Sequence, residues 1–271
     1  MLKRIGLLLL TVWKLCVVNG QDLNKADIVF KDAFDSVNGT FVLYDLEQNN
    51  YYYYNEDRAN TRYPPMSTFK IPNSLIALET GVLDSANSMI VWDSTKIPCN
   101  PDWNFYPVSE WCRDHSLASA FKYSVVWYYQ EVARRIGHDR MQEYLNKINY
   151  GNNDIDAGID NFWFRKLKIS AKEQIEFLKA FYIEEIDFDP DNIGIVKDIM
   201  IIEETDNHVL YGKTGGGAIG DHHTIGWFVG FVETDDNVFF FALNMDGKDF
   251  ISVRDSREKI AKEILTGLSV L

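Results

Sequence analysis

Hydrophobic and polar positions alternate near the start of the chain in the way that a half-buried β-strand requires. Residues 40–46 alternate and are rich in β-branched and aromatic side chains, and residues 51–54 repeat that character after a polar turn at 48–50. The two segments predict an antiparallel hairpin, so that the domain starts in a sheet. Apolar runs bounded by turn residues predict three later strands, at 208–213, 225–233 and 238–244.

Apolar positions at helical spacing predict a helix over 68–80, which begins within one turn of Ser67 and ends at Gly81. From about 82 to 205 the pattern is mainly helical, with a loop rich in Gly, Asn and Asp at 149–164. Further helices are predicted at 124–136, 171–183 and 252–268. This order predicts a mixed α/β (α+β) fold, in which a largely antiparallel sheet is flanked by helices and carries an inserted helical lobe at about 82–205.

Composition narrows the class of protein and of partner. The chain has 271 residues, 46% hydrophobic and 14% aromatic, enough to bury the core of one large domain or of two closely joined lobes. Its formal net charge of -13 argues against nucleic acid or an anionic membrane as a binding partner, because a protein that binds phosphates needs a basic face. An anionic substrate then has to be captured by a few local cations.

The N-terminal residues predict an export signal over 1–20. Lys3 and Arg4 precede an apolar run at 5–13, and small residues follow before a cut ahead of Gln21. The mature domain is then 21–271, exported to the periplasm or secreted. A retained helix is the alternative, because Lys14 interrupts the apolar stretch. No later segment is long and apolar enough for stable membrane insertion.

The chain has three cysteines, and their spacing allows either a disulfide or free thiols in the mature protein. Cys16 leaves with the signal, so Cys99 and Cys112 form either a disulfide or two separate buried thiols, since spacing does not show whether they come within bridging distance. The histidines at 115, 222 and 223 have none of the spacings that zinc sites use, and no metal is predicted.

The first candidate for chemistry is Ser67-Thr68-Phe69-Lys70. A spacing of three at a helix start puts the Ser67 hydroxyl and the Lys70 amine on one face, as a nucleophile beside its base. The helix N-terminus adds N–H groups for a developing oxyanion. By itself the motif is weak, because a serine cap followed by a solvated lysine is common at helix starts.

A second cation lies in Lys213-Thr214-Gly215, at the end of a predicted strand and followed by Gly216 and Gly217. The glycines let a ligand lie against the strand backbone, while Lys213 and Thr214 can bind a carboxylate. A phosphate loop is excluded by order, because there the glycines precede the lysine. Ser124 opens a predicted helix and offers a hydroxyl that relays a proton, or else an ordinary N-cap.

Together these motifs resemble the class D (oxacillinase-type) serine β-lactamases along nearly all of the mature chain. The elements that carry the resemblance are Ser67-Thr68-Phe69-Lys70, Ser124-Val125-Val126, Tyr150-Gly151-Asn152, Phe162-Trp163, Lys213-Thr214-Gly215 and Trp227-Phe228-Val229-Gly230. The resemblance implies the serine β-lactamase and penicillin-binding protein architecture. It also implies hydrolysis of a small-molecule β-lactam through an acyl-enzyme, giving antibiotic resistance, by a monomer or a homodimer.

Site residues follow from the same resemblance. Ser67 is the implied nucleophile, Ser124 the proton relay, and Lys70 the base after carboxylation by carbon dioxide to N6-carboxylysine, with no other cofactor. Trp163 steadies the carbamate. The remaining implied roles are substrate binding by Lys213, Thr214, Gly215, Gly216 and Arg254, and support by Val126, Tyr150 and Asn152.

The carboxylated lysine has a physical rationale. An apolar pocket lowers the pKa of a lysine, so that a neutral amine is present to react with carbon dioxide. Val126, Phe69, Phe162 and Trp163 are candidate dry walls, and plain core packing is their simpler role. The N–H groups of Ser67 and Gly216 are expected to stabilise the oxyanions.

Phe164 and Gly216 depart from the usual family pattern, where leucine and an aromatic residue are common.

Two rival functions share the motifs. One is a β-lactam sensor domain, which is acylated without turnover and follows several membrane segments. The other is a cell-wall peptidase. Tyr150-Gly151-Asn152 and Trp163 favour the hydrolase, and its substrate range then depends on the loop at 103–111 and on the segment after Gly216.

Overall fold

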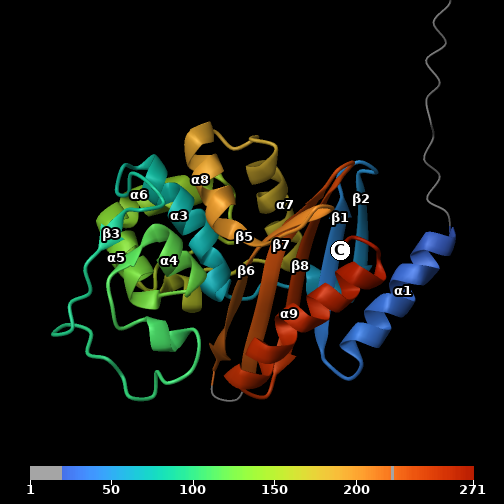
Figure 1. The fold of residues 1–271 in the computed structure, drawn as a ribbon, viewed down its shortest axis with the longest axis horizontal. Helices are drawn as coiled ribbons and strands as arrows, with labels where there is room; N and C mark the ends of the chain where they lie inside the picture. Colours follow the sequence, from blue (N-terminus) through green and yellow to red (C-terminus); the bar gives the residue numbers. More distant parts are fainter. Residues whose placement is uncertain (1–19, 221–222) are drawn as a thin grey trace, which may run out of the picture.

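The computed structural model describes residues 20–220 and 223–271. A six-stranded sheet in the order β2-β1-β8-β7-β6-β5, with every neighbouring pair antiparallel, forms its centre (Figure 1). The strands are β1 (Gly39–Asp45), β2 (Asn50–Tyr54), β5 (Ile201–Glu204), β6 (His208–Ile219), β7 (His223–Thr234) and β8 (Val238–Gly247). The predicted mixed fold with a largely antiparallel sheet is confirmed.

Helices cover both faces of the sheet. On one face lie α1 (Gly20–Phe34) and α9 (Phe250–Gly267), and α7 (Ala171–Tyr182) packs on the other (Figure 1). Strand β1 shows how alternation builds both cores: Phe41 and Leu43 face α1 and α9, whereas Val42 and Tyr44 face the helical side. The predicted start in a sheet is wrong, because α1 precedes β1 and packs along α9.

The helical lobe lies beside the β5–β6 edge of the sheet (Figure 1). Within the predicted range 82–205 it contains a two-stranded sheet and five helices, of which α7 also covers the main sheet. Their bounds are β3 (Met89–Ile90), β4 (His115–Ser116), α4 (Leu117–Lys122), α5 (Val126–Ile136), α6 (His138–Lys147), α7 and α8 (Pro190–Met200). Short helices complete the fold: α2 (Glu56–Ala59) and the 3-10 turns η1 (Met66–Phe69), η2 (Val108–Glu110) and η3 (Phe162–Phe164).

Three predicted boundaries are corrected. The helix expected from Thr68 is the 3-10 turn η1 followed by α3 (Lys70–Glu79), after which Gly81 takes the left-handed φ of +67° that ends a helix. Helix α5 begins at Val126, so Ser124 lies outside it. Strand β6 continues to Ile219, so Lys213-Thr214-Gly215 is in mid-strand, because pairing with β7 extends through the glycines.

The part of the chain that precedes Ser67 is tied to the loop that follows α6. Tyr63 and Ile169 exchange two backbone hydrogen bonds of 3.0 and 2.9 Å. Gly151 lies within this loop with φ +61°, and a Cβ there would be 2.1 Å from the carbonyl oxygen of Lys168. Only glycine allows the two backbones to come this close.

The predicted signal segment lies, apart from Gly20, outside the described residues. None of the helices described has the length and apolarity needed to cross a bilayer.

Replacing Gly151 by alanine should therefore lower the free energy of unfolding by at least about 2 kcal/mol, from the left-handed φ and the contact with Lys168. The matched control is Gly194→Ala in α8, where a Cβ meets no atom within 4 Å. That change should raise the free energy of unfolding by about 0.5–1 kcal/mol. Urea unfolding measures both, and equal effects of the two substitutions would contradict the packing described.

Candidate active site

The turn that carries Ser67 is held from two sides by buried hydrogen bonds. From the sheet, the Trp227 indole N–H donates to the carbonyl oxygen of Pro64 over 2.9 Å. From α7, Gln174 donates to the Thr68 hydroxyl over 2.9 Å, and that hydroxyl donates to the carbonyl oxygen of Pro65 over 2.7 Å. These bonds fix the backbone on both sides of the nucleophile.

The residue before Ser67 has an unusual backbone. Met66 adopts a φ of +52°, the left-handed region that non-glycine residues seldom occupy. Such a conformation costs free energy and persists only where the surroundings enforce it. Here the two prolines before it and the hydrogen bonds to Pro64 and Pro65 supply that enforcement.

Ser67 and Lys70 form the predicted pair. A hydrogen bond of 2.9 Å joins the Lys70 Nζ and the Ser67 Oγ. Lys70 is 2% exposed, and burial lowers its pKa from 10.5 to about 7. The centroid of the Tyr129 ring lies 5.2 Å from the Lys70 Nζ. At neutral pH a large fraction of this amine is therefore uncharged and able to accept the serine proton.

Strand β6 passes directly against the nucleophile. A Cβ on Gly215 would lie 3.2 Å from the Ser67 nitrogen and 3.0 Å from the Pro65 oxygen, so a side chain here would crowd the backbone that carries Ser67. Lys213 is 5% exposed and its Nζ donates to the Thr214 carbonyl oxygen over 3.0 Å. Burial, together with the positive charges of Lys70 and Arg257, holds the pKa of Lys213 well below its usual value. An anion placed here would relieve that repulsion.

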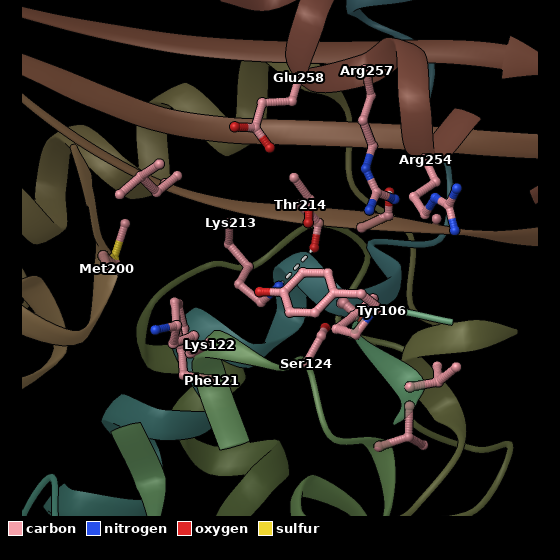
Figure 2. Close-up of a pocket in the computed structure, with 18 of the residues that line it drawn as sticks. Tyr106, Phe121, Lys122, Ser124, Met200, Lys213, Thr214, Arg254, Arg257 and Glu258 are labelled. Atoms are coloured by element: carbon pink, nitrogen blue, oxygen red, sulfur yellow. Dashed lines mark hydrogen bonds between the residues drawn. The ribbon is translucent and has the colours of Figure 1, made fainter. Parts of the chain in front are cut away.

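A cavity of about 1130 Å³ joins these groups (Figure 2). Figure 2 shows Thr214 of β6 on one side of the cavity, and Phe121, Lys122 and Ser124 of the α4–α5 segment on the other. Its lining includes Ser67, Phe105, Tyr106, Phe121, Lys122, Ser124, Val126, Phe164, Met200, Lys213, Thr214, Gly215, Gly216, Phe250, Arg254, Arg257 and Glu258. Cationic, hydroxyl and aromatic groups thus meet in one place, as a carboxylate-bearing substrate with an acyl group would need.

Ser124 reaches the cavity from a loop rather than from a helix start. It sits between α4 and α5 with a φ of +55°, and its backbone N–H donates to the carbonyl oxygen of Phe121 over 3.1 Å. The prediction that Ser124 opens a helix is therefore wrong, but its side chain lines the cavity with Ser67 and Lys213 (Figure 2). Val126, the first residue of α5, lines the same wall.

The aromatic residues of η3 pack behind the nucleophile. Trp163 stacks on Phe69 with 5.6 Å between ring centroids, and Phe162 meets the same ring edge-on at 5.0 Å. Trp163 is 2% exposed, whereas its neighbour Phe164 lines the cavity. Phe164 and Gly216, the two residues that depart from the pattern of the resembled family, therefore both line the cavity.

Tyr150 and Asn152 support the site from a distance. Tyr150 is buried edge-on against Phe69 at 5.8 Å. The Asn152 side chain accepts from the Lys168 N–H over 2.8 Å and donates to the Lys166 carbonyl oxygen over 3.0 Å. Asn152 thus braces the loop and does not line the cavity.

Arg257 is the site residue that sequence reasoning missed. Its Nη1 donates to the Gly215 carbonyl oxygen over 2.6 Å and it is 9% exposed, whereas the predicted Arg254 is paired with Asp255 at 2.7 Å nearer the solvent. Both line the cavity (Figure 2). The sequence did contain a signal for Arg257, because its helical spacing from Val253 and Ile260 puts it on the buried face of α9.

Cys99, Cys112, His115 and His223 have structural partners in the described part of the chain. Cys99 and Cys112 form a disulfide with 5.6 Å between their Cα atoms, which answers the question left open by the spacing. His115 bonds to Ser119 and to the Glu110 carbonyl oxygen, and His223 pairs with Asp246 at 2.6 Å. His222 lies outside the described residues.

The family model and the similar proteins of known sequence point to the same family. The model of the penicillin binding protein transpeptidase domain matches residues 35–267. The chain is 41% identical over 225 residues to the probable β-lactamase YbxI of Bacillus subtilis, covering 83% of this chain and 80% of that protein. It is also 41% identical over 219 residues to the regulatory protein BlaR1 of Bacillus licheniformis, covering 81% of this chain but only 35% of BlaR1.

Solved structures point to the same family. The class D β-lactamase FUS-1 from Fusobacterium nucleatum is 41% identical to this chain and superposes with a TM-score of 0.82, over 89% of this chain and 98% of that one. The chain thus spans about a third of the length of BlaR1 and nearly all of the FUS-1 chain.

The buried Lys70 amine should give stability a defined pH dependence in buffer free of carbon dioxide. Between pH 7 and 10 the unfolded chain holds a proton on Lys70 that the folded chain has released, so the free energy of unfolding rises with pH by about 1.4 kcal/mol per unit. Below pH 7 both states are protonated and the cost of burial is fully present. In Lys70→Met this contribution to the slope should vanish.

The measurement is urea unfolding of the wild type and of Lys70→Met from pH 6 to pH 10, with Lys259→Met as the control for loss of one exposed positive charge. A constant difference between the wild type and Lys70→Met across this range would contradict a neutral Lys70 in the folded protein.

Proposed function

The chain belongs to the penicillin binding protein transpeptidase family and is homologous to the class D β-lactamases, and we propose that it opens the lactam ring of penicillin-type antibiotics through an acyl-enzyme at Ser67. The observation that carries the proposal is the 2.9 Å contact between the Ser67 hydroxyl and a buried Lys70 amine at the edge of the cavity. A serine hydroxyl becomes a nucleophile only when such a base takes its proton.

The substrate carboxylate is held at the positive end of the cavity in this proposal. Lys213, Thr214 and Arg257 converge there, and an anion offsets the repulsion among the buried cations. Arg254 lies one turn earlier on α9 and adds positive charge at the mouth. Seated in this way, the lactam ring lies along β6, against the Ser67 backbone.

Acylation follows from this placement. The Ser67 Oγ attacks the lactam carbonyl carbon, its proton passes to the base at Lys70, and the oxyanion is stabilised by the N–H groups of Ser67 and Gly216. The C–N bond then breaks, and the ring nitrogen receives a proton through the Ser124 hydroxyl on the opposite wall. Water, deprotonated by the same base, hydrolyses the ester and restores Ser67.

The surroundings of Lys70 suit a carboxylated amine. Burial keeps the amine neutral, as its reaction with carbon dioxide requires, and the Trp163 indole packed on Phe69 lies beside the Ser67–Lys70 segment as a hydrogen-bond donor. The carbamate formed would supply an anionic oxygen base in place of the amine. Phe164 would control access of water and carbon dioxide from the cavity side.

A β-lactam receptor is the second candidate function, and the 41% identity to BlaR1 favours it. Such a domain would use the same nucleophile and the same carboxylate site. The two functions differ only after acylation, because a receptor keeps the ester that a hydrolase cleaves.

We further propose that the protein works outside the cytoplasm, in the periplasm or as a secreted protein. The Cys99–Cys112 disulfide supports this, because disulfides persist mainly in oxidising compartments.

The test is the ultraviolet loss of a penicillin in large excess over the purified protein, with and without bicarbonate. We expect continued turnover that bicarbonate increases and that is abolished by Ser67→Ala, a loss of roughly 10³-fold or more. Acidification below pH 7 should lower the rate, because it protonates the Lys70 amine before carbon dioxide can react.

Two other outcomes would decide between the hydrolase and the receptor or rule out both. One stoichiometric burst that then stops, in bicarbonate, would favour the receptor over the hydrolase. Turnover that persists in Ser67→Ala would contradict both functions.

A further inference from the structure

The loop between Cys99 and Cys112 is anchored to the helical lobe at one end. The disulfide closes its base, the Trp111 indole donates to the Tyr123 carbonyl oxygen over 2.9 Å, and the Trp127 indole donates to the Trp111 carbonyl oxygen over 2.9 Å. Closing the loop with a covalent bond limits the range of positions that its tip can reach.

The tip of this loop contacts the opposite lobe. The guanidinium carbon of Arg254 lies 5.4 Å from the centroid of the Phe105 ring, within the range of a cation–π interaction. Arg254 belongs to α9, which packs on the sheet, whereas Phe105 belongs to the loop tied to α4 and α5. Both side chains line the same cavity, so their contact spans its mouth.

The position of the contact along the cavity is defined by α9. Arg254 precedes Arg257 by one helical turn, and Arg257 donates to the Gly215 carbonyl oxygen beside Ser67 (Figure 2). The Phe105–Arg254 contact therefore covers the end of the cavity where the proposed function places the substrate carboxylate. Met200 lines the cavity on the side away from Arg254 (Figure 2).

We propose that the Phe105–Arg254 contact, termed the bridge, determines specificity by limiting the size of the substituent that a β-lactam carries beside its ring carboxylate. This inference rests on the proposed function. A small substituent fits beneath the bridge, whereas a large one has to separate Phe105 from Arg254 before Ser67 can attack. The acylamino side chain at the other end of the lactam is not restricted by it.

Arg254 then has a different role from Arg257. Arg257 is buried against the strand and binds the anion, while Arg254 acts through Phe105 on the shape of the mouth. Losing a partly exposed cation–π contact should change the rate for a bulky compound by about fivefold. The rate for a small compound should change much less, because that compound never opens the bridge.

The experiment compares two cephalosporins with the same acylamino side chain, one with a methyl group and the other with a large aryl-vinyl group beside the carboxylate. Acylation of Ser67 is followed by quenched intact-protein mass spectrometry, a readout that exists whether or not the ester turns over. The quantity compared is the ratio of the two acylation rate constants, bulky over small.

Phe105→Ala and Arg254→Gln should each raise this ratio about fivefold, and the double variant should raise it no further, because both remove one contact. Phe105→Tyr keeps the ring and should keep the wild-type ratio. Arg113→Gln is the matched control, because it removes a cation–π contact of similar length, 5.3 Å from the Arg113 guanidinium carbon to the centroid of the Tyr123 ring, from a residue outside the cavity lining. Its ratio should stay within twofold of the wild type.

Several results would overturn the bridge while leaving the proposed function intact. They are an unchanged ratio in Phe105→Ala, additive effects in the double variant, or a fall in both rates in Arg254→Gln equal to that in Arg257→Ala. The last would assign Arg254 to carboxylate binding. Failure of both compounds to acylate the wild type would instead contradict the proposed function itself.

Discussion

Folding removes the Lys70 amine from water and leaves it 2.9 Å from the Ser67 hydroxyl, with no acidic side chain among its described hydrogen-bond partners. Desolvation without an opposite charge favours the neutral amine, which brings its pKa to about 7. A base is thereby created at the one position where a serine needs it. The cost is free energy of folding, which the large aromatic core around Phe69 and Trp163 has to offset.

The rest of the structure holds this pair in place. Trp227 on β7 and Gln174 on α7 fix the backbone on either side of Ser67, so that the strained Met66 is tolerated. Gly215 lets β6 approach, which places the buried Lys213 and the Arg257 guanidinium beside the nucleophile. Two lobes of different secondary structure thus meet at a site that neither could form alone.

The sequence predicted the chemistry better than it predicted the geometry. Ser67, Lys70 and Lys213 stand in short motifs whose spacing carries local information, and they meet as expected. The Trp227–Pro64 bond joins residues 163 positions apart, and no local pattern encodes it. Arg257 was missed for a different reason: it stands in none of the motifs that carry the resemblance, although its spacing of four from Val253 placed it on the buried face of α9.

The central claim is that burial alone keeps Lys70 neutral beside Ser67, and its direct test is the titration of the Lys70 side-chain nitrogen. In protein labelled with ¹⁵N at lysine Nζ, and in buffer free of carbon dioxide, the resonance that is lost in Lys70→Met identifies this group. The account predicts a midpoint near pH 7, well below the pKa of 10.5 of an ordinary lysine. A midpoint near pH 10 would show that Lys70 is a charged amine and would contradict its role as the base.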